Sequence, residues 1–430
     1  MFLGIIILLV FAFFAALMYL NRLPALIALP LMAVVISVIA GVPAEDIAAF
    51  VISDGAVRLN LAIATVMFGA ILSQFVKNTG IAETMVKKVA ELAGDNTFLT
   101  ALAMTVVVAV LFTVLGGLGS VIMVASIALP IMLSIGLPRL TAASLFLMGL
   151  GLGGIFNLTN WQLFISVLGL SQGQILRFAV VLGALSAVTI FSFLLVEVKL
   201  RGTSVGWEIK KDGDAKPSVH WPAVLTPVIP IILVLGFAAY NFFAKPFQPF
   251  NFPIITAMIL GLVWGFFTTY KKGSLNLLIK SVVDGIGSVG PAIAIIMGIG
   301  MLLNAVTSPS VIESLSPIMA RIIPSGPVLY VVFFTVLAPL SLYRGPLNLW
   351  GMGAGLVSLI ICSGILPPFA VMAALMSVGQ IQGVSDPTNT HNVWVANYLN
   401  LNVQDILKRT MPYMWILAAT GLIFAALMSF

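Results

Sequence analysis

The chain has 430 residues, of which 61% are hydrophobic and only 8% are charged. A soluble globular domain carries about 25% charged residues, so this composition excludes that class. The formal net charge is +6, but no basic run interleaves with aromatic residues, and we therefore expect no nucleic-acid partner.

Apolar runs that suit membrane helices recur along the whole chain. A helix needs about 20 residues to cross a bilayer, and a spanning backbone must satisfy its own hydrogen bonds. The sequence therefore predicts an all-α membrane protein that crosses the bilayer several times. The plainest predicted spans cover residues 1–20, 26–40, 61–76, 223–243, 254–267 and 413–430.

The chain contains two copies of one pattern. An Asp-Gly pair at 54–55 recurs at 284–285, and the run NLTN at 157–160 recurs as DPTN at 386–389. These matches keep their order at offsets of 229 or 230 positions, as an internal repeat requires. We expect the first repeat to cover 1–198 and the second 223–430, with a polar linker at 199–222 between them.

Each copy has the same predicted layout. Two plain spans precede a third that starts after the Asp-Gly pair, so Asp54 and Asp284 are expected to be helix caps or surface groups. Then come an amphipathic stretch, two short apolar segments, an interrupted crossing and a closing span. In the first copy these four parts cover 81–93, 98–135, 140–170 and 178–198.

The layout also predicts the topology. The two short segments add an even number of crossings, whether they form a re-entrant hairpin or two full spans. Each copy then crosses an odd number of times, and the second copy is inverted. An external N-terminus places fifteen Lys and Arg residues on one face and four on the other, and the positive-inside rule makes the fifteen cytoplasmic. We expect both termini outside an inner membrane and the linker in the cytoplasm.

Interrupted membrane helices expose backbone groups that can hold an anion or a cation. The run GVSDPTNTHN at 383–392 is unusually polar for this chain, and we expect it to unwind the second copy's helix at Gly383 and Pro387. The tips GGLGS and YRGPLN have small residues that let a ligand approach the backbone. The candidate substrate-binding residues are Gly116, Gly117, Gly119, Ser120, Asn157, Thr159, Asn160, Arg344, Gly345, Asn348, Ser385, Asp386, Thr388, Asn389 and Thr390.

Arg344 is the candidate anion ligand. A guanidinium is costly at membrane depth, and its planar fork suits a carboxylate. The first copy has Leu115 at the equivalent position, which favours substrate binding over a structural need common to both copies; the alternative is an Arg344–Asp386 ion pair. Asp386 could also carry a proton or ligate Na⁺. His391 is either a proton carrier or an ordinary hydrogen-bonding side chain.

The two inverted copies, the tips GGLGS and YRGPLN, and the breaks NLTN and DPTN resemble the ion transporter superfamily. That superfamily includes gluconate permeases, citrate transporters, C4-dicarboxylate carriers and divalent-anion symporters. The resemblance covers essentially the whole chain. It implies a homodimer in which the hairpins and broken helices form a mobile transport domain. The first two spans of each copy would form the scaffold, and the amphipathic stretches 81–93 and 311–323 would connect the two parts.

These features predict a secondary transporter that carries a small carboxylate with H⁺ or Na⁺, and the resemblance implies that it works by an elevator-like movement. The alternative is a cation/proton antiporter with Asp386 and His391 as exchange groups, against which the scarcity of intramembrane acids weighs. A channel or a scaffold fits the duplicated breaks poorly. No spacing typical of a metal site, a cofactor site or a catalytic nucleophile occurs, so we expect neither a cofactor nor an enzyme.

Overall fold

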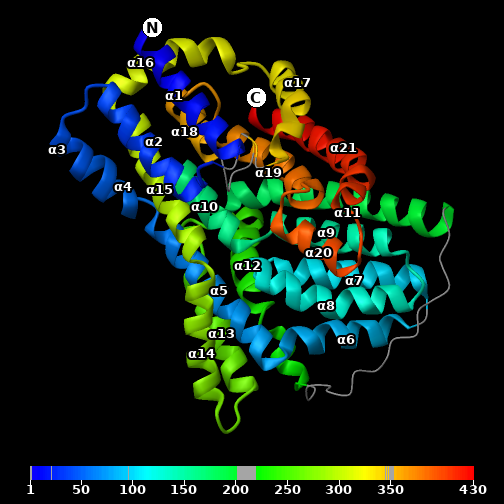
Figure 1. The fold of residues 1–430 in the computed structure, drawn as a ribbon. Helices are drawn as coiled ribbons and strands as arrows, with labels where there is room; N and C mark the ends of the chain where they lie inside the picture. The colour runs from blue at the N-terminus through cyan, green and yellow to red at the C-terminus, as the bar shows by residue number, and fades with distance from the viewer. Residues whose placement is uncertain are drawn as a thin grey trace.

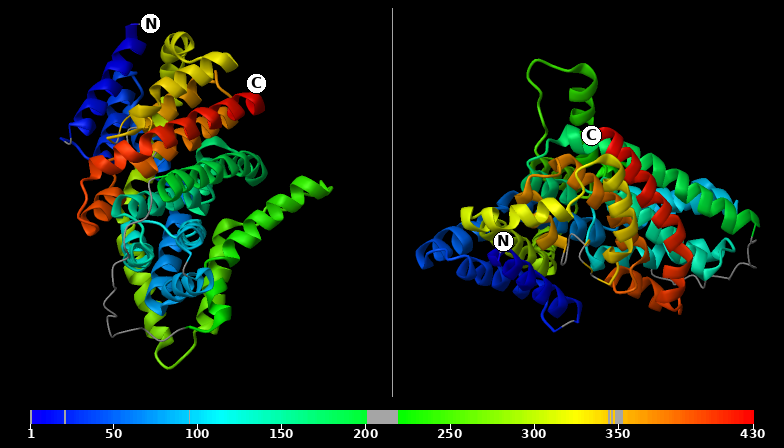
Figure 2. Two further views of the ribbon diagram at one scale, coloured as in Figure 1. Left: turned by 90° about the vertical axis from the view of Figure 1, so that its right-hand side faces the viewer. Right: turned by 90° about the horizontal axis from the view of Figure 1, so that it is seen from above.

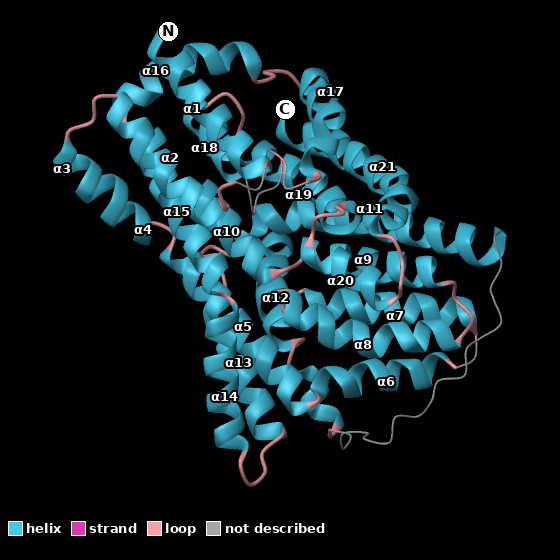
Figure 3. Ribbon diagram, viewed as in Figure 1, coloured by secondary structure: helices cyan, strands magenta, loops and turns pink. Residues whose placement is uncertain are grey.

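The structure is a computed structural model. It describes residues 2–20, 22–94, 96–200, 219–343, 345, 347 and 353–430. Within these ranges every regular element is a helix (Figure 3). Four of the described helices are long and apolar enough to cross a membrane, or up to seven if each of three bent pairs is one span. The chain is a multi-pass α-helical membrane protein, and the predicted fold class is confirmed.

The helices before the linker follow the predicted layout. In chain order they are α1 (Phe2–Tyr19), α2 (Ala25–Ile39), α3 (Ala44–Asp46), η1 (Ile47–Asp54), α4 (Gly55–Val57), α5 (Asn60–Thr79), α6 (Ile81–Ala93), α7 (Thr97–Phe112), α8 (Leu118–Ser134), α9 (Arg139–Ile155), α10 (Leu158–Leu168), α11 (Gln172–Leu195) and η2 (Val196–Leu200). At 16 and 17 residues, α7 and α8 are shorter than the ~20 of a full span, as in a re-entrant hairpin.

The helices after the linker repeat the layout. They are η3 (Trp221–Leu225), α12 (Ile229–Ala244), α13 (Ile254–Thr268), α14 (Ser274–Ser288), α15 (Gly290–Val306), α16 (Pro309–Ile322), α17 (Pro327–Leu337), η4 (Ala338–Ser341), α18 (Gly353–Ser363), α19 (Pro368–Ser385), α20 (Thr390–Tyr398) and α21 (Val403–Ser429). The arm α16 corresponds to α6, and the broken pair α19 and α20 corresponds to α9 and α10.

The third span of each copy shows how the copies are related. It covers residues 44–79 in the first copy and residues 274–306 in the second. A Cβ built on Gly55 of α4 would lie 2.6 Å from the Cα of Met301, and one built on Gly285 of α14 would lie 2.8 Å from the Cα of Ile71. At an offset of 230 positions, Gly55 corresponds to Gly285 and Ile71 corresponds to Met301. The two contacts are therefore reciprocal, as they are when a two-fold axis relates the two copies. The first half of each element packs along the second half of the other. The two elements therefore run antiparallel, and the second copy is inverted.

The start of this element differs from the prediction. The helical backbone begins at Ala44 in the first copy and at Ser274 in the second, so Asp54 and Asp284 lie inside a helix. Both carboxylates are exposed, and neither caps a helix. The residues around the Asp-Gly pairs are apolar enough to continue the helix, and the element bends a few residues later instead, by 49° at Val289 in the second copy.

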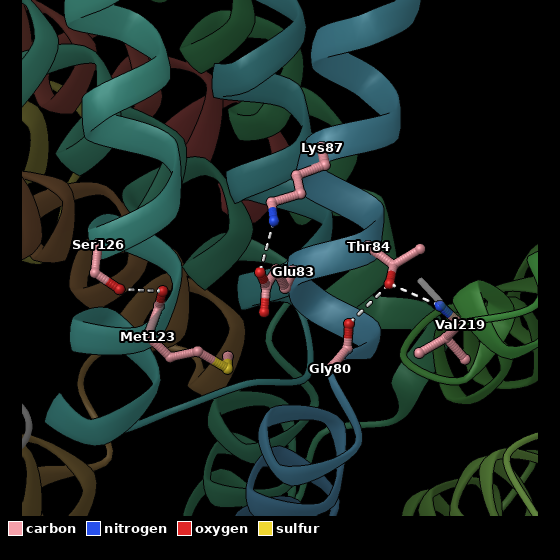
Figure 4. Close-up of polar contacts among 7 residues, drawn as sticks. All are labelled: Gly80, Glu83, Thr84, Lys87, Met123, Ser126 and Val219. Atoms are coloured by element: carbon pink, nitrogen blue, oxygen red, sulfur yellow. Dashed lines mark hydrogen bonds and ion pairs between the residues drawn. The ribbon is translucent and has the colours of Figure 1, made fainter. Parts of the chain in front are cut away.

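The arm α6 is held by the end of the linker, and the arm α16 is held by the start of the first copy. The backbone N–H of Val219, which leads into η3 and α12, donates to Thr84 Oγ1 of α6 at 3.2 Å, and that hydroxyl donates to the Gly80 carbonyl at 3.0 Å (Figure 4). Conversely, Gly4 of α1 lies against the carbonyl of Ser314 in α16, and Ser314 is the counterpart of Thr84. Each arm is thus anchored outside its own hairpin.

The helices form two groups (Figures 1 and 2). The scaffold group is α1 to α5 with α12 to α15, in which α15 packs on α2 and α14 on α5. The hairpin group is α7 to α11 with α17 to α21, in which α19 packs on α21 and α9, and α7 packs on α9. A buried Glu197 joins the closing helices of the two copies in this group: Arg409 Nη1 lies 3.4 Å from its Oε1, and Thr141 donates to its Oε2 at 2.9 Å.

The reciprocal glycine contact predicts a position-specific stability loss. Gly285→Val should lower the free energy of unfolding by about 1–3 kcal/mol, because the side chain would meet the α5 backbone. Gly287→Val is the matched control, since Gly287 lies on the same helix, is exposed and has no described atom within 4 Å of an added Cβ. Thermal unfolding in detergent measures both. Equal melting temperatures for the two variants would contradict the inferred crossing.

Candidate functional site

Asn157 is the residue at the first break. Asn157 lies between α9 and α10, which meet at 44°, and its Oδ1 accepts the backbone N–H groups of Thr159 at 3.0 Å and Asn160 at 3.3 Å. Its Nδ2 donates to the carbonyls of Phe112 at 2.9 Å and Leu115 at 3.2 Å, at the tip of the α7–α8 hairpin. Asn157 therefore caps the broken helix and fastens it to the hairpin tip at the same time.

The second break uses a carboxylate in the equivalent place. Asp386 has no exposed surface, and its Oδ1 accepts the N–H of Thr388 at 2.9 Å and the hydroxyl of Thr388 at 2.8 Å. The same oxygen accepts the N–H of Tyr343, in the tip after α17 and η4, at 3.0 Å. At the first break the side chain thus donates hydrogen bonds to carbonyls of its tip. At the second break the side chain accepts a hydrogen bond from a backbone amide of its tip.

A second pair of equivalent residues satisfies the helix ends at the breaks. Asn160 Nδ2 donates to the Gly154 carbonyl at 3.2 Å, and Asn389 Nδ2 donates to the Gln382 carbonyl at 3.4 Å. Asn389 also caps α20, because its Oδ1 accepts the N–H of His391 at 3.2 Å. These amides take the place of backbone partners that the broken helices have lost.

The first tip docks on a scaffold helix. Ser120 at the start of α8 shares a hydrogen bond with Ser73 of α5, and a Cβ built on Gly69 of the same helix would lie 3.2 Å from Thr159 Oγ1. Sequence analysis missed Gly69, Ser73 and the adjacent Gln74 as site residues. The signal was present, because Ser73 and Gln74 are consecutive polar residues inside a predicted span.

The glycines of the tips play different parts. Gly116 and Gly117 are exposed, and Gly117 has a φ of +78°, which strains any residue with a side chain. Gly119 is half-buried near the amide of Gln74. Gly345 is buried against the Leu340 carbonyl, so its lack of a side chain serves close packing. Arg344 and Asn348 lie outside the described residues.

The break in the second copy is shorter than predicted. α19 continues through Gly383 to Ser385, and only 386–389 are non-helical, so Gly383 does not break the helix. Ser385 is 1% exposed, and its hydroxyl shares a 2.7 Å hydrogen bond with Thr410 of α21, which directs it into the helix contact. Thr390 is exposed and His391 half-buried, both in the first turn of α20.

Asn392 is a further polar residue that sequence analysis missed. It has no exposed surface, and its Nδ2 donates to the Asp386 carbonyl at 2.9 Å. Its Oδ1 has no hydrogen-bond partner among the described residues. In the same ranges, no three His, Cys, Asp or Glu side chains lie together as a metal site requires.

No protein-family model matches the chain, and no curated protein is similar to it in sequence. Its structure is similar to that of two transporters. The YdaH transporter of Alcanivorax borkumensis, described as having an unusual topology, matches with a TM-score of 0.60 at 13% identity over 87% of each chain. MtrF of Neisseria gonorrhoeae, described as illuminating a class of antimetabolite efflux pumps, matches with a TM-score of 0.58 at 13% identity. That match covers 89% of this chain and 82% of MtrF.

The chain has the fold of these transporters. At this low identity, the likeness carries the architecture and not the substrate. Both neighbours are described as transporters or pumps. The resemblance to the ion transporter superfamily, drawn from the tips and breaks, stays a prediction.

The two-sided bonding of Asn157 makes a testable prediction. Asn157→Asp should lower the free energy of unfolding by about 1–3 kcal/mol, because a carboxylate still caps α10 but leaves the two buried carbonyls of the hairpin tip without a donor. Thermal unfolding measures the change.

Asn402→Asp is the matched control. Asn402 caps α21 by accepting the N–H of Gln404 at 2.9 Å, a task that aspartate performs equally well. If both substitutions leave the melting temperature unchanged, Asn157 does not fasten the break to the hairpin.

Proposed function

We propose that the protein is a secondary transporter of a small organic anion, coupled to H⁺ or Na⁺. The observation that carries the proposal is that each broken helix is bonded to its hairpin tip through a polar side chain, Asn157 in the first copy and Asp386 in the second. A helix interrupted inside a membrane protein leaves backbone amides and carbonyls near the bilayer midplane, which is where secondary transporters bind their substrates.

The charge pattern favours an anion. The helices α10 and α20 each begin at a break, and a helix N-terminus attracts negative charge. Arg344 directly follows Tyr343, whose N–H is bonded to Asp386. A guanidinium in that tip supplies the bidentate partner that a carboxylate needs. The remaining candidate ligands are the tip glycines with Ser120, the first-break residues Asn157, Thr159 and Asn160, and the second-break residues Thr388, Asn389 and Thr390.

Asp386 is the proposed coupling group. Its Oδ1 accepts three hydrogen bonds, including the one that holds the second tip. Protonation would remove the charge that strengthens these bonds, and so would loosen the tip. A Na⁺ ion could instead use the carboxylate and nearby carbonyl oxygens as ligands. His391, on the first turn of α20, is the second proton-carrying candidate.

The movement that we propose is of the elevator type. The hairpin group would carry the substrate past the scaffold group, while the anchored arms α6 and α16 connect the two. We assign the first repeat to 1–198, the linker to 199–222 and the second repeat to 223–430. A homodimer joined through the scaffold, an inner-membrane location, external termini and a cytoplasmic linker belong to the same proposal.

A cation/proton antiporter on the same fold is the second candidate. The specific observation in its favour is the fully buried carboxylate of Asp386, since intramembrane acids mark proton and cation paths. The description of MtrF as an efflux pump adds export as a direction to be tested. Exchange of Na⁺ for protons without any organic anion would identify the antiporter.

Binding of organic anions to the purified protein tests the leading proposal. A ligand at 100 times its Kd should stabilise the folded state by about 2.7 kcal/mol, so thermal unfolding against a panel of monocarboxylates, dicarboxylates, citrate and sugar acids should reveal the substrate class. Arg344→Ala should abolish the stabilisation while leaving the unliganded melting temperature near the wild-type value. Repeating the panel with and without Na⁺, at acidic and alkaline pH, identifies the coupling ion.

Arg321→Ala provides the control, because Arg321 is an exposed cation at the end of α16. It should keep the full response. Normal anion binding by Arg344→Ala would contradict the assignment of that residue, and stabilisation by Na⁺ alone, with no active anion, would favour the antiporter.

A further inference from the structure

The loop between α12 and α13 is rich in aromatic residues. It runs from Lys245 to Pro253 with the sequence KPFQPFNFP, and two further phenylalanines, Phe242 and Phe243, stand just before it at the end of α12. Lys245 is the only charged residue of the chain between positions 221 and 270. The loop therefore presents rings and a single positive charge, with no acid nearby in the sequence.

The internal repeat does not require this aromatic loop. The equivalent connection in the first copy lies between α1 and α2 and has the sequence LNRLP. It contains no aromatic residue and carries Arg22. Since the first copy makes the same connection without rings, the rings of the second copy need a reason of their own.

The loop is held in a fixed conformation on one side. Asn241 Nδ2 donates to the Phe250 carbonyl at 2.9 Å, and Gln172 Nε2, at the start of α11, donates to the Phe252 carbonyl at 2.9 Å. The rings of Phe250 and Phe252 contact each other and Phe237, with ring centroids 5.4 to 6.0 Å apart. Two amide bonds and a cluster of three rings thus order the loop.

The other side of the loop displays rings that the chain leaves uncovered. Phe247 is 99% exposed and Phe243 is 80% exposed. In Figure 2, α12 and the loop that follows it project from the rest of the molecule. Contact between such rings and water is unfavourable, so an ordered loop that displays two of them requires an apolar cover.

The lengths of the two helices place the loop at the edge of the membrane. α12 has 16 residues and α13 has 15, so at 1.5 Å per residue they are about 24 Å and about 22 Å long. The hydrocarbon core of a bilayer is about 30 Å thick. Lys271 and Lys272 follow the other end of α13 and belong outside the core. A helix of this length that starts beside them brings the loop no further than the opposite edge of the core.

The backbone of the loop requires polar surroundings. The N–H groups of residues 247–252 form no hydrogen bond with any residue that the structure describes, and such groups are not tolerated in hydrocarbon. In the headgroup layer, water and lipid phosphates accept these bonds. Lys245 suits the same layer, because anionic headgroups attract a lysine near the membrane surface. The boundary between headgroups and acyl chains gives the backbone its polar surroundings and the rings their apolar ones.

We propose that the α12–α13 loop is a lipid anchor, whose backbone lies in the headgroup layer and whose Phe243 and Phe247 rings insert among the acyl chains. Its partner is the bilayer that surrounds the chain. The two rings continue the lipid-facing surface of α12, on which Ile232 is 60% exposed. The anchor fixes one end of the scaffold group at a set depth in the membrane, whatever the protein transports.

The depth of the loop is measured with a nitroxide spin label in liposomes. In a Cys362→Ala background, which removes the chain's single cysteine, the label is attached to Phe247→Cys, to the lipid control Ile232→Cys and to the water control Lys272→Cys. Collision of the label with oxygen, which concentrates in lipid, is compared with collision with a water-soluble nickel chelate. We expect oxygen to dominate at positions 247 and 232, and the chelate to dominate at position 272.

Two results would overturn the proposal. A label at position 247 that collides mainly with the chelate would place the loop in water. A label that collides with neither agent would show that a protein surface, such as that of a second copy, covers the ring. Phe247→Cys should unfold in detergent at the wild-type temperature, because a side chain that is 99% exposed has few contacts to lose. Phe243→Cys provides a second reading of the same layer.

Discussion

The structure depends on a single constraint, which is that backbone polar groups inside a membrane protein need partners. A helix can be interrupted there only if other groups satisfy the amides and carbonyls that the break releases. In this chain the side chain at each break bonds backbone groups both of the break and of the neighbouring hairpin tip. Asn157 caps α10 and bonds the carbonyls of one hairpin tip, whereas Asp386 bonds the turn of its own break and the amide of the other tip. Each break and its tip therefore form one polar unit.

The two units are related by the internal repeat but are chemically different. An amide both donates and accepts, so the first unit is neutral and complete. A carboxylate only accepts, so the second unit differs in its chemistry from the first. In the proposed mechanism, substrate binding and ion coupling meet at this carboxylate. The first unit is also docked on α5 through the hydrogen bond between Ser73 and Ser120.

Much of this architecture follows from the sequence, because hydrophobic length and an internal repeat are strong signals. The spans, the hairpins, the arms and both breaks were predictable in order. Three features were not. The third element starts earlier than predicted because an apolar helix can carry Asp54 on an exposed face. Gly383 stays helical, and the Gln382 carbonyl beside it accepts a hydrogen bond from the Asn389 amide. Ser120 and Ser73 are bonded to each other because of tertiary packing. A single sequence does not reveal that two such distant residues lie close together.

Transport by the purified protein in liposomes tests the central claim most directly. Uptake of the anion that stabilises the protein would be followed with an inward H⁺ gradient, an inward Na⁺ gradient or neither. The account predicts saturable uptake that is driven above equilibrium by one of the two gradients and is lost when Arg344 is replaced by alanine. Saturable or not, uptake that neither gradient accelerates would contradict coupled transport. Gradient-driven exchange of cations with no anion movement would replace it with antiport.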